Sequence, residues 1–318
     1  MATGKPIVIL GSINMDLVCR TPYMPAGGET IIGSDFVTVP GGKGANQAVA
    51  AAKLGGDVHM IGRVGDDDFG ARLLNGLKLH GVKTDYVTVT EGVASGVAMI
   101  LVDKKGENSI VVAAGANAKV SPADVDAAER LIKSACCVVM QLEIPFETVK
   151  HAIAMCQRLG VPTILDPAPA PAKLPRALYG VDVLTPNQSE AEILLEQDQT
   201  HHVKKKRVAD PKQIATDLLA HGPKSVVLKL GKNGAMALDR DGEHDGVFCT
   251  AKSFKVKVVD TTAAGDAFTG ALAVARAEGM SRNDMMRFAC AAGSLACTGF
   301  GAQPALPSRA AVEKLMEG

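Results

Sequence analysis

Short apolar runs that end at glycine or polar residues recur along the chain, and stretches of helical composition separate them. Such runs occupy residues 7–10, 135–142, 163–165, 181–184 and 225–230. Apolar runs of this length without polar alternation are typical of strands buried on both faces. Their alternation with helices predicts an α/β fold, in which helices cover both faces of a mostly parallel sheet.

Two segments, residues 17–40 and 85–113, depart from this alternation because they are rich in β-branched residues and lack a helical period. The second segment contains three β patterns, Tyr86–Val89, Val97–Val102 and Ser109–Val112. We expect the two segments to form one small sheet that is discontinuous in sequence. The remaining residues, 1–16, 41–84 and 114–318, would form the body.

Residues 259–268 follow an alternating β pattern at Phe254–Val258 and lead into a run of small residues that predicts a buried helix. Ala263–Gly265 carry almost no side chain, so their N–H groups would lie open at the helix N-terminus, which suits an anion. Asp266 in the same turn could take a proton from an alcohol while the N–H groups hold a phosphoryl group. The alternative is that Asp266 only caps the helix.

The carboxyl end of the first predicted strand is followed by Asn14 and Asp16. In an extended segment these side chains point to the same side, and open α/β sheets bind ligands at this edge. An amide and a carboxylate together can bind a diol. An ordinary turn is the alternative.

Residues 40–48 place Gly41, Gly42 and Lys43 before a segment of helical composition. The glycines allow close approach of the backbone to a ligand, and Asn46 would lie in the first helical turn, directed back toward the loop. The spacing excludes a Walker A loop and a GxGxxG loop. A plain turn with an exposed lysine is the alternative.

Polar residues also end later strands. Glu143 and Asp166 follow two of the apolar runs, and an exposed acid is the alternative for Glu143. Asn187 and Glu190 are three residues apart and share one face of a turn. That spacing is also common where a helix begins.

Composition narrows the class of protein. The 318 residues are 47% hydrophobic, carry 34 basic and 34 acidic side chains, and include no tryptophan. The net charge of zero and the 3% aromatic content argue against nucleic acid or an anionic membrane as partner. We interpret the basic run His201–Arg207 as a solvated loop. No apolar run approaches the length of a membrane span. Seven cysteines without a CxxC motif predict free thiols in a reducing compartment, the cytoplasm.

Three motifs carry a resemblance to a known family. DTTAAGDAF at 260–268, GGKGANQA at 41–48 and GSINMD at 11–16 resemble the signatures of the ribokinase-type (PfkB) carbohydrate kinases. The resemblance implies a ribokinase-like fold in which the small sheet is a lid and the interface of a homodimer. It implies ATP-dependent phosphorylation of D-ribose at O5.

The resemblance also implies roles for individual residues. Asp266 would be the catalytic base, with an anion hole formed by Ala263, Ala264 and Gly265. The sugar contacts would be Asn14, Asp16, Gly42, Lys43, Asn46, Glu143 and Asp266. The ATP contacts would be Asn187, Lys229, Gly231, Gly234 and Gly265, with Lys229 standing where threonine is common.

Two kinds of cation are implied as well. Glu190 would position Mg²⁺ through water. A monovalent cation, K⁺, would be held mostly by backbone carbonyls of Asp260, Thr262, Ala296, Gly299, Gly301 and Ala305. Ala305 stands where serine is usual, so one hydroxyl ligand is missing.

Other substrates and one other class of function stay open. A kinase for 2-deoxyribose, another sugar or a nucleoside is the nearest alternative, and Asp16 discriminates because its two oxygens suit a vicinal diol that 2-deoxyribose lacks. A catalytically silent sugar-binding protein is the alternative from a different class. The retention of Asp266 beside an intact anion hole argues against it.

Overall fold

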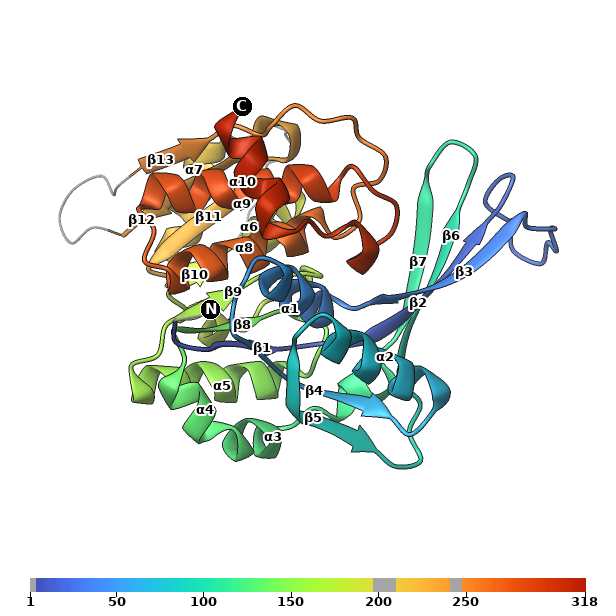
Figure 1. Cartoon of the computed structure of the whole chain (residues 1–318), viewed down its shortest axis with the longest axis horizontal. Helices are drawn as coiled ribbons and strands as arrows, with labels where there is room; N and C mark the ends of the chain where they lie inside the picture. Colours follow the sequence, from blue (N-terminus) through green and yellow to red (C-terminus); the bar gives the residue numbers. More distant parts are fainter. Residues whose placement is uncertain (1–3, 197–209, 241–247) are drawn as a thin grey trace.

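A computed structural model describes residues 4–196, 210–240 and 248–318, so the basic run His201–Arg207 lies outside the described residues. A large sheet has the strand order β13-β12-β11-β10-β9-β8-β1-β4-β5 (Figure 1). Its strands are β1 (Ile7–Leu10), β4 (Val58–Gly65), β5 (Lys83–Thr90), β8 (Cys137–Met140), β9 (Thr163–Leu165), β10 (Val183–Leu184), β11 (Ser225–Lys229), β12 (Ala235–Asp239) and β13 (Phe248–Ala251). Neighbours pair in parallel from β5 to β11, and β12 and β13 are antiparallel. The carboxyl ends of the parallel strands therefore meet at one edge.

Helices pack on both faces of this sheet, as predicted. On β1, Ile7 and Ile9 point into one hydrophobic core, whereas Val8 and Leu10 point into the other, because successive side chains of a strand alternate between faces. The first core is covered by α1 (Lys43–Lys53), α2 (Asp68–Leu79), α8 (Ala264–Ala277), α9 (Arg282–Ala296) and α10 (Arg309–Glu317). The second is covered by α3 (Pro122–Ala127), α4 (Glu129–Ser134), α5 (Phe146–Leu159), α6 (Gln188–Glu196) and α7 (Pro211–Ala220). Among these described helices, none has the length and hydrophobicity needed to cross a membrane.

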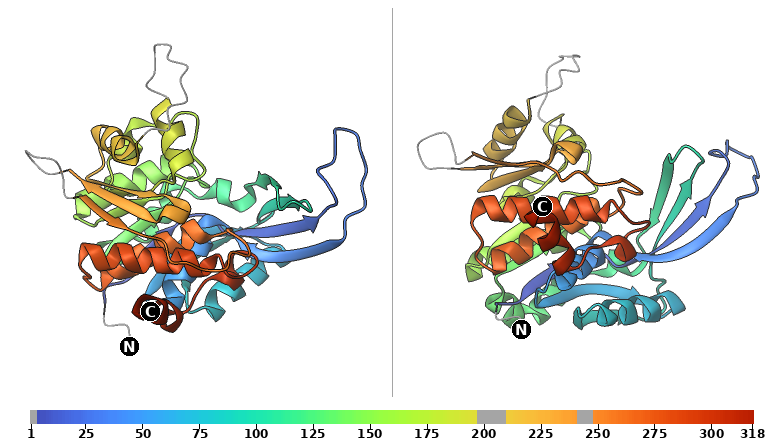
Figure 2. Two further views of the ribbon diagram at one scale, coloured as in Figure 1. Left: turned by 90° about the horizontal axis from the view of Figure 1, so that it is seen from above. Right: turned by 45° about the horizontal axis from the view of Figure 1, so that its top comes forward.

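A second sheet has four strands in the order β3-β2-β6-β7. They are β2 (Asn14–Arg20), β3 (Asp35–Gly41), β6 (Gly96–Val102) and β7 (Asn108–Ala113). Figure 2 shows that this small sheet extends away from the body in both views. The predicted discontinuous sheet therefore exists, and it is built from two separate parts of the chain.

Three details of the sequence interpretation need correction. The assignment of Tyr86–Val89 to the small sheet is wrong, because β5 pairs in parallel with β4 at the edge of the large sheet. The small sheet also begins earlier than expected, since β2 starts at Asn14 and pairs along its length with β3 and β6. The alternating pattern at Phe254–Val258 is an extended segment without strand pairing, in which Phe254 N donates to Ser294 Oγ (3.1 Å). An alternating pattern indicates a half-buried extended segment, but it does not indicate which strand pairs with that segment.

The interior position of β1, between β4 and β8, leads to a stability prediction. Ile9 is 0% exposed between β4 and β8, so Ile9→Ala should lower the free energy of unfolding by about 2–5 kcal/mol through lost burial and a residual cavity. Ile193→Ala, in α6 where the side chain is 40% exposed, is the matched control and should change it by about 0.5 kcal/mol or less. Urea denaturation measures both, and equal losses would contradict the assignment of β1 to the centre of the core.

Candidate active site

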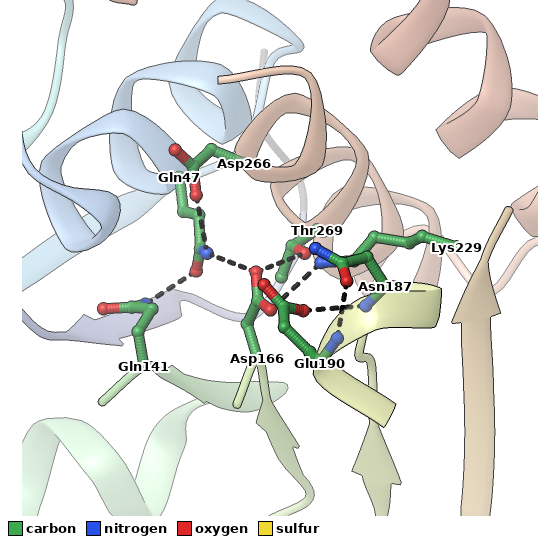
Figure 3. Close-up of polar contacts among 8 residues, drawn as sticks. All are labelled: Gln47, Gln141, Asp166, Asn187, Glu190, Lys229, Asp266 and Thr269. Atoms are coloured by element: carbon green, nitrogen blue, oxygen red, sulfur yellow. Dashed lines mark hydrogen bonds and ion pairs between the residues drawn. The ribbon is translucent and has the colours of Figure 1, made fainter. Parts of the chain in front are cut away.

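The carboxyl edge of the large sheet brings together residues from distant parts of the chain. The strands β1, β8, β9 and β11 end here, and the helices α1, α6 and α8 begin here. Figure 3 shows side chains from α1, α6, α8 and β11, and from the chain just after β8 and β9, joined by hydrogen bonds and ion pairs. This is the edge at which open α/β sheets bind ligands.

The start of α8 has the backbone geometry of an anion site. Ala263 is the N-cap, and among the described residues it is the only non-glycine with a positive φ (59°). The first intrahelical bond runs from Ala267 N to Ala263 O (2.8 Å), so the N–H groups of residues 264–266 precede it, and that of Ala264 donates to Thr261 O (3.3 Å). A left-handed alanine costs about 1–2 kcal/mol, and such strain tends to occur at functional sites. The role of this turn as an anion hole stays a prediction.

Asp266 is held by side chains of α1. Its side chain is 6% exposed, Asn46 Nδ2 donates to its Oδ2 (3.0 Å), and Gln47 Nε2 donates to its Oδ1 (3.1 Å). The alternative that Asp266 only caps α8 is wrong, because Ala263 is the N-cap and the carboxylate bonds to another helix. Burial raises the pKa of Asp266 to about 6; Lys43 and the two amide donors lower it, and Asp166 adds to the increase.

Asn14 and Asp16 lie on β2 and are both buried. Asn14 Oδ1 accepts a hydrogen bond from Asn117 Nδ2 (2.7 Å), and Asn117 also bonds both backbone groups of Ile13. A Cβ on Gly41 would lie 2.1 Å from Asp16 Oδ2, so only glycine fits there. These contacts exclude an ordinary exposed turn for Asn14 and Asp16. Sequence reasoning missed Asn117, which lies in the 3-10 helix Gly115–Lys119.

Glu143 fastens the loop that precedes α1. Its Oε2 accepts from Ser12 Oγ (2.5 Å) and from Lys43 N (3.1 Å), so it is not the freely exposed acid that was the alternative. Ser12 in turn accepts from Gly44 N (3.3 Å). Gly42 has φ 86° at the N-cap of α1, and a Cβ there would lie 2.7 Å from Asn14 N. The glycine loop is therefore packed tightly against the start of β2.

Burial and neighbouring charges shift the pKa values of Asp16 and Lys43. Burial raises the pKa of Asp16 to about 7, with Glu143 and Asp266 adding to the increase and Lys43 opposing it. Burial alone would lower the pKa of Lys43, but the surrounding carboxylates raise it above its usual range. The carboxylates responsible are Asp266, Asp166, Glu143 and Glu190. Lys43 therefore stays charged and lies among carboxylates.

A buried ion pair lies beside Asp266. Lys229 Nζ bonds Asp166 Oδ1 (3.0 Å), and Asp166 Oδ2 accepts from Gln47 Nε2 (3.1 Å) and Thr269 Oγ1 (3.3 Å). Gln141 Nε2 donates to Gln47 Oε1 (2.6 Å). Gln47 thus joins Asp166 to Asp266, as Figure 3 shows. Sequence reasoning singled out none of Gln47, Gln141 and Thr269.

Asn187 and Glu190 form a reciprocal pair at the start of α6. Asn187 N donates to Glu190 Oε2 (2.7 Å), and Glu190 N donates to Asn187 Oδ1 (2.8 Å). This is the arrangement of a capping box, so the helix-start interpretation of the spacing is correct. It does not exclude a ligand role, because both side chains lie near Lys229 (Figure 3). The predicted ATP contacts Gly231 and Gly234 lie in the turn after β11, with φ 56° and 91°.

The predicted monovalent-cation residues lie in two segments that contact each other. Asp260 Oδ1 accepts from Thr262 N (2.9 Å) and Thr262 Oγ1 (2.7 Å), and Asp260 Oδ2 accepts from Gly301 N (3.0 Å). A Cβ on Gly299 would lie 2.9 Å from Ala305 Cβ, and Ala296 ends α9 just before this loop. Within the described ranges, no cluster of three His, Cys, Asp or Glu side chains could hold a metal ion. Cation binding here stays a prediction.

Comparison with known proteins identifies the family. The family model of the pfkB family carbohydrate kinases matches residues 5–309. The chain belongs to this family. A ribokinase of Bacillus subtilis (strain 168) is 42% identical over 312 residues, which cover 98% of this chain and 99% of that enzyme. A deoxyribokinase of Salmonella typhi is 36% identical over 305 residues, which cover 95% of each chain.

A solved structure supports the same assignment. Arabidopsis thaliana ribokinase, complexed with ribose and ATP, matches with a TM-score of 0.88 and 34% identity over 100% of both chains. The predicted family and fold class are therefore confirmed for this pfkB carbohydrate kinase: a mostly parallel sheet with helices on both faces and a second small sheet.

The raised pKa values predict the pH dependence of this kinase. Asp266 and Asp16 gain protons as the pH falls through about 6 and about 7, and a protonated Asp266 cannot act as base. We expect log kcat/KM to fall below pH 7, with a slope that exceeds one below pH 6, where both groups are protonated. In Asp16→Asn the slope should decrease to one, because one titrating group is removed. A wild-type slope of one with a midpoint below pH 5 would contradict the raised pKa values.

Proposed function

We propose that this protein transfers the γ-phosphoryl group of ATP to O5 of D-ribose, giving ribose 5-phosphate and ADP. The observation that carries the proposal is the position of Asp266, a buried carboxylate with a pKa raised to about 6 in the first turn of α8. It lies beside backbone N–H groups suited to a phosphoryl group. Full-length likeness to ribokinases supports the choice of sugar.

The geometry supports a direct transfer. Asp266 takes the proton of the sugar hydroxyl, and that oxygen attacks the γ-phosphorus as the bond to the β-phosphate oxygen breaks. The N–H groups of Ala263, Ala264 and Gly265 and the dipole of α8 stabilise the charge on the moving group, with Ala264 N shared between the phosphoryl group and Thr261 O. Loss of one such donor typically raises the barrier by about 3 kcal/mol. Asn46 and Gln47 hold the carboxylate in place.

Asn14 and Asp16 are the proposed ligands of the sugar hydroxyls, together with Gly42, Lys43, Asn46 and Glu143. A carboxylate with two oxygens suits a vicinal diol. A site built for the 2-hydroxyl would discriminate against a sugar that lacks it, because a buried polar group would be left without a partner. Because the chain is also similar to a deoxyribokinase of Salmonella typhi, 2-deoxyribose stays the alternative substrate.

The donor sets also fit the two cations. Glu190 and Asn187 present oxygen and amide groups beside Lys229, and Mg²⁺ usually takes few protein ligands and shares phosphate oxygens. When bound, it would neutralise phosphate charge. Backbone carbonyls of the loops around Asp260 and Gly301 are the proposed ligands of K⁺, and the bond from Gly301 N to Asp260 Oδ2 (3.0 Å) holds these loops together. The methyl group of Ala305 supplies no oxygen there.

We also infer a homodimer through the small sheet and a location in the cytoplasm. The side chains of β7 are all exposed, and apolar Ile110, Val111 and Val112 are among them. A second copy would cover this apolar surface. The seven cysteines are free thiols, in keeping with a reducing compartment.

A panel of substrates tests the reaction. ATP consumption should depend on ribose and exceed that with 2-deoxyribose, fructose or adenosine, because Asp16 suits a vicinal diol. The assay is coupled to ADP formation, with and without K⁺. Preference for 2-deoxyribose or adenosine would keep the mechanism and overturn the choice of ribose, whereas sugar binding without turnover would favour a silent binding protein.

The role of the base is tested by Asp266→Asn. The variant keeps the shape of the side chain but cannot accept the proton, so kcat should fall by on the order of 10²–10⁴. Asp85→Asn, on the exposed edge of β5, is the control and should keep wild-type turnover. A folded Asp266→Asn variant within tenfold of wild type would show that another group takes the proton.

A further inference from the structure

Lys229 lies between the nucleotide side of the site and the start of α8. It ends β11, its backbone N donates to Pro186 O (2.9 Å), and it is bridged to Asn187. Its side chain reaches the first turn of α8, where a Cβ added to Gly265 would lie 3.5 Å from Nζ. The ammonium therefore lies against the turn that is the predicted anion hole.

The ammonium is well fixed in this place. The side chain of Lys229 is 12% exposed and that of Asp166 is 2% exposed. Asp166 is itself held by Gln47 and Thr269 (Figure 3). An ammonium has three donors, and in the part of the chain that is described one of them is bonded, to Asp166. Its position leaves the remaining donors near the start of α8.

We propose that Lys229 is a further catalytic residue, whose ammonium contacts the β- and γ-phosphate oxygens of ATP at the start of α8 while Asp166 holds it in position. This inference rests on the proposed function. A lysine here adds a full positive charge to the dipole of α8, at a position where threonine is common in the family that the sequence resembles. Lys43 is the first residue of α1, on the proposed sugar side of the site, so the two lysines contact different reactants.

The chemical role follows from the direction of charge movement. When the bond between the γ-phosphorus and the bridging oxygen breaks, the electron pair stays on the β-phosphate of ADP. A fixed ammonium close to that oxygen stabilises the leaving group. The sugar proton goes to Asp266, so Lys229 gives up no proton in the step.

A purely structural role is the competing explanation, because a buried carboxylate such as Asp166 needs a partner whether or not nucleotide binds. The double variant Asp166→Asn/Lys229→Met separates the two. It removes both charges and keeps similar side-chain sizes, so the destabilisation of Lys229→Met alone should be largely relieved. The double variant still lacks the ammonium of Lys229, so it should not regain the binding of phosphates.

The experiment measures three quantities for wild type, both single variants and the double variant. Thermal unfolding reports stability, titration calorimetry reports the dissociation constants of ADP and adenosine, and kcat is taken at pH 8, where Asp266 is ionised. We expect the double variant to unfold near the wild-type temperature, bind ADP about 10- to 100-fold more weakly, keep its adenosine affinity, and lose at least tenfold in kcat. The matched control is Asp182→Asn/Lys224→Met, an ion pair (2.7 Å) beside the opposite end of β11, which should leave ADP affinity and kcat unchanged.

Two outcomes would overturn the inference. A double variant with wild-type ADP affinity and kcat would show that Lys229 only neutralises Asp166, and so would a wild type that binds ADP no more tightly than adenosine. If wild type binds ADP but phosphorylates no sugar, the proposed function fails. The comparison of ADP with adenosine then still decides whether Lys229 contacts phosphate.

Discussion

The free-energy cost of placing several carboxylates next to one another in a buried space governs this site. Asp16, Asp166 and Asp266 are almost fully buried. The charge of Asp266 adds to the raised pKa of Asp16, and the charge of Asp166 adds to the raised pKa of Asp266. Two lysines and a set of amide donors oppose that repulsion. The ends of α1, α8 and β11 must therefore lie close together in a fixed geometry. Each supplies either a buried carboxylate or a lysine or amide group that offsets the free-energy cost of burying that carboxylate.

Gln47 connects two of these buried carboxylates. Its Nε2 donates to Asp166 and to Asp266, and its Oε1 accepts from Gln141. The amide therefore fixes the distance between the proposed base and the carboxylate that holds Lys229. Since α1 also starts at the glycine loop beside β2, one helix sets the position of the base relative to the proposed sugar ligands.

The sequence was sufficient for the fold class and for the groups whose chemistry is local. Small residues followed by a lone acid indicated the start of α8 and Asp266, and strand ends indicated Asn14, Asp16 and Glu143. The sequence was insufficient for Gln47 and Asn117, because an amide acquires its role from partners that lie 119 and 103 residues away. The same limit explains β5, since an edge strand of the large sheet and a strand of the small sheet share one alternating pattern. The predicted division into body and lid, like the site roles, stays a prediction.

The strand β2 belongs to the small sheet, yet it also carries Asn14 and Asp16. The groups proposed to recognise the sugar therefore lie in the same sheet as the proposed lid, and not in the large sheet of the body. Any rotation of the small sheet would move the recognition groups with it. Sugar affinity in this enzyme would then depend on the angle between the two sheets as well as on the groups that bind the sugar. A substitution on β3 or β7, far from the site, could change the preferred sugar without contacting the sugar.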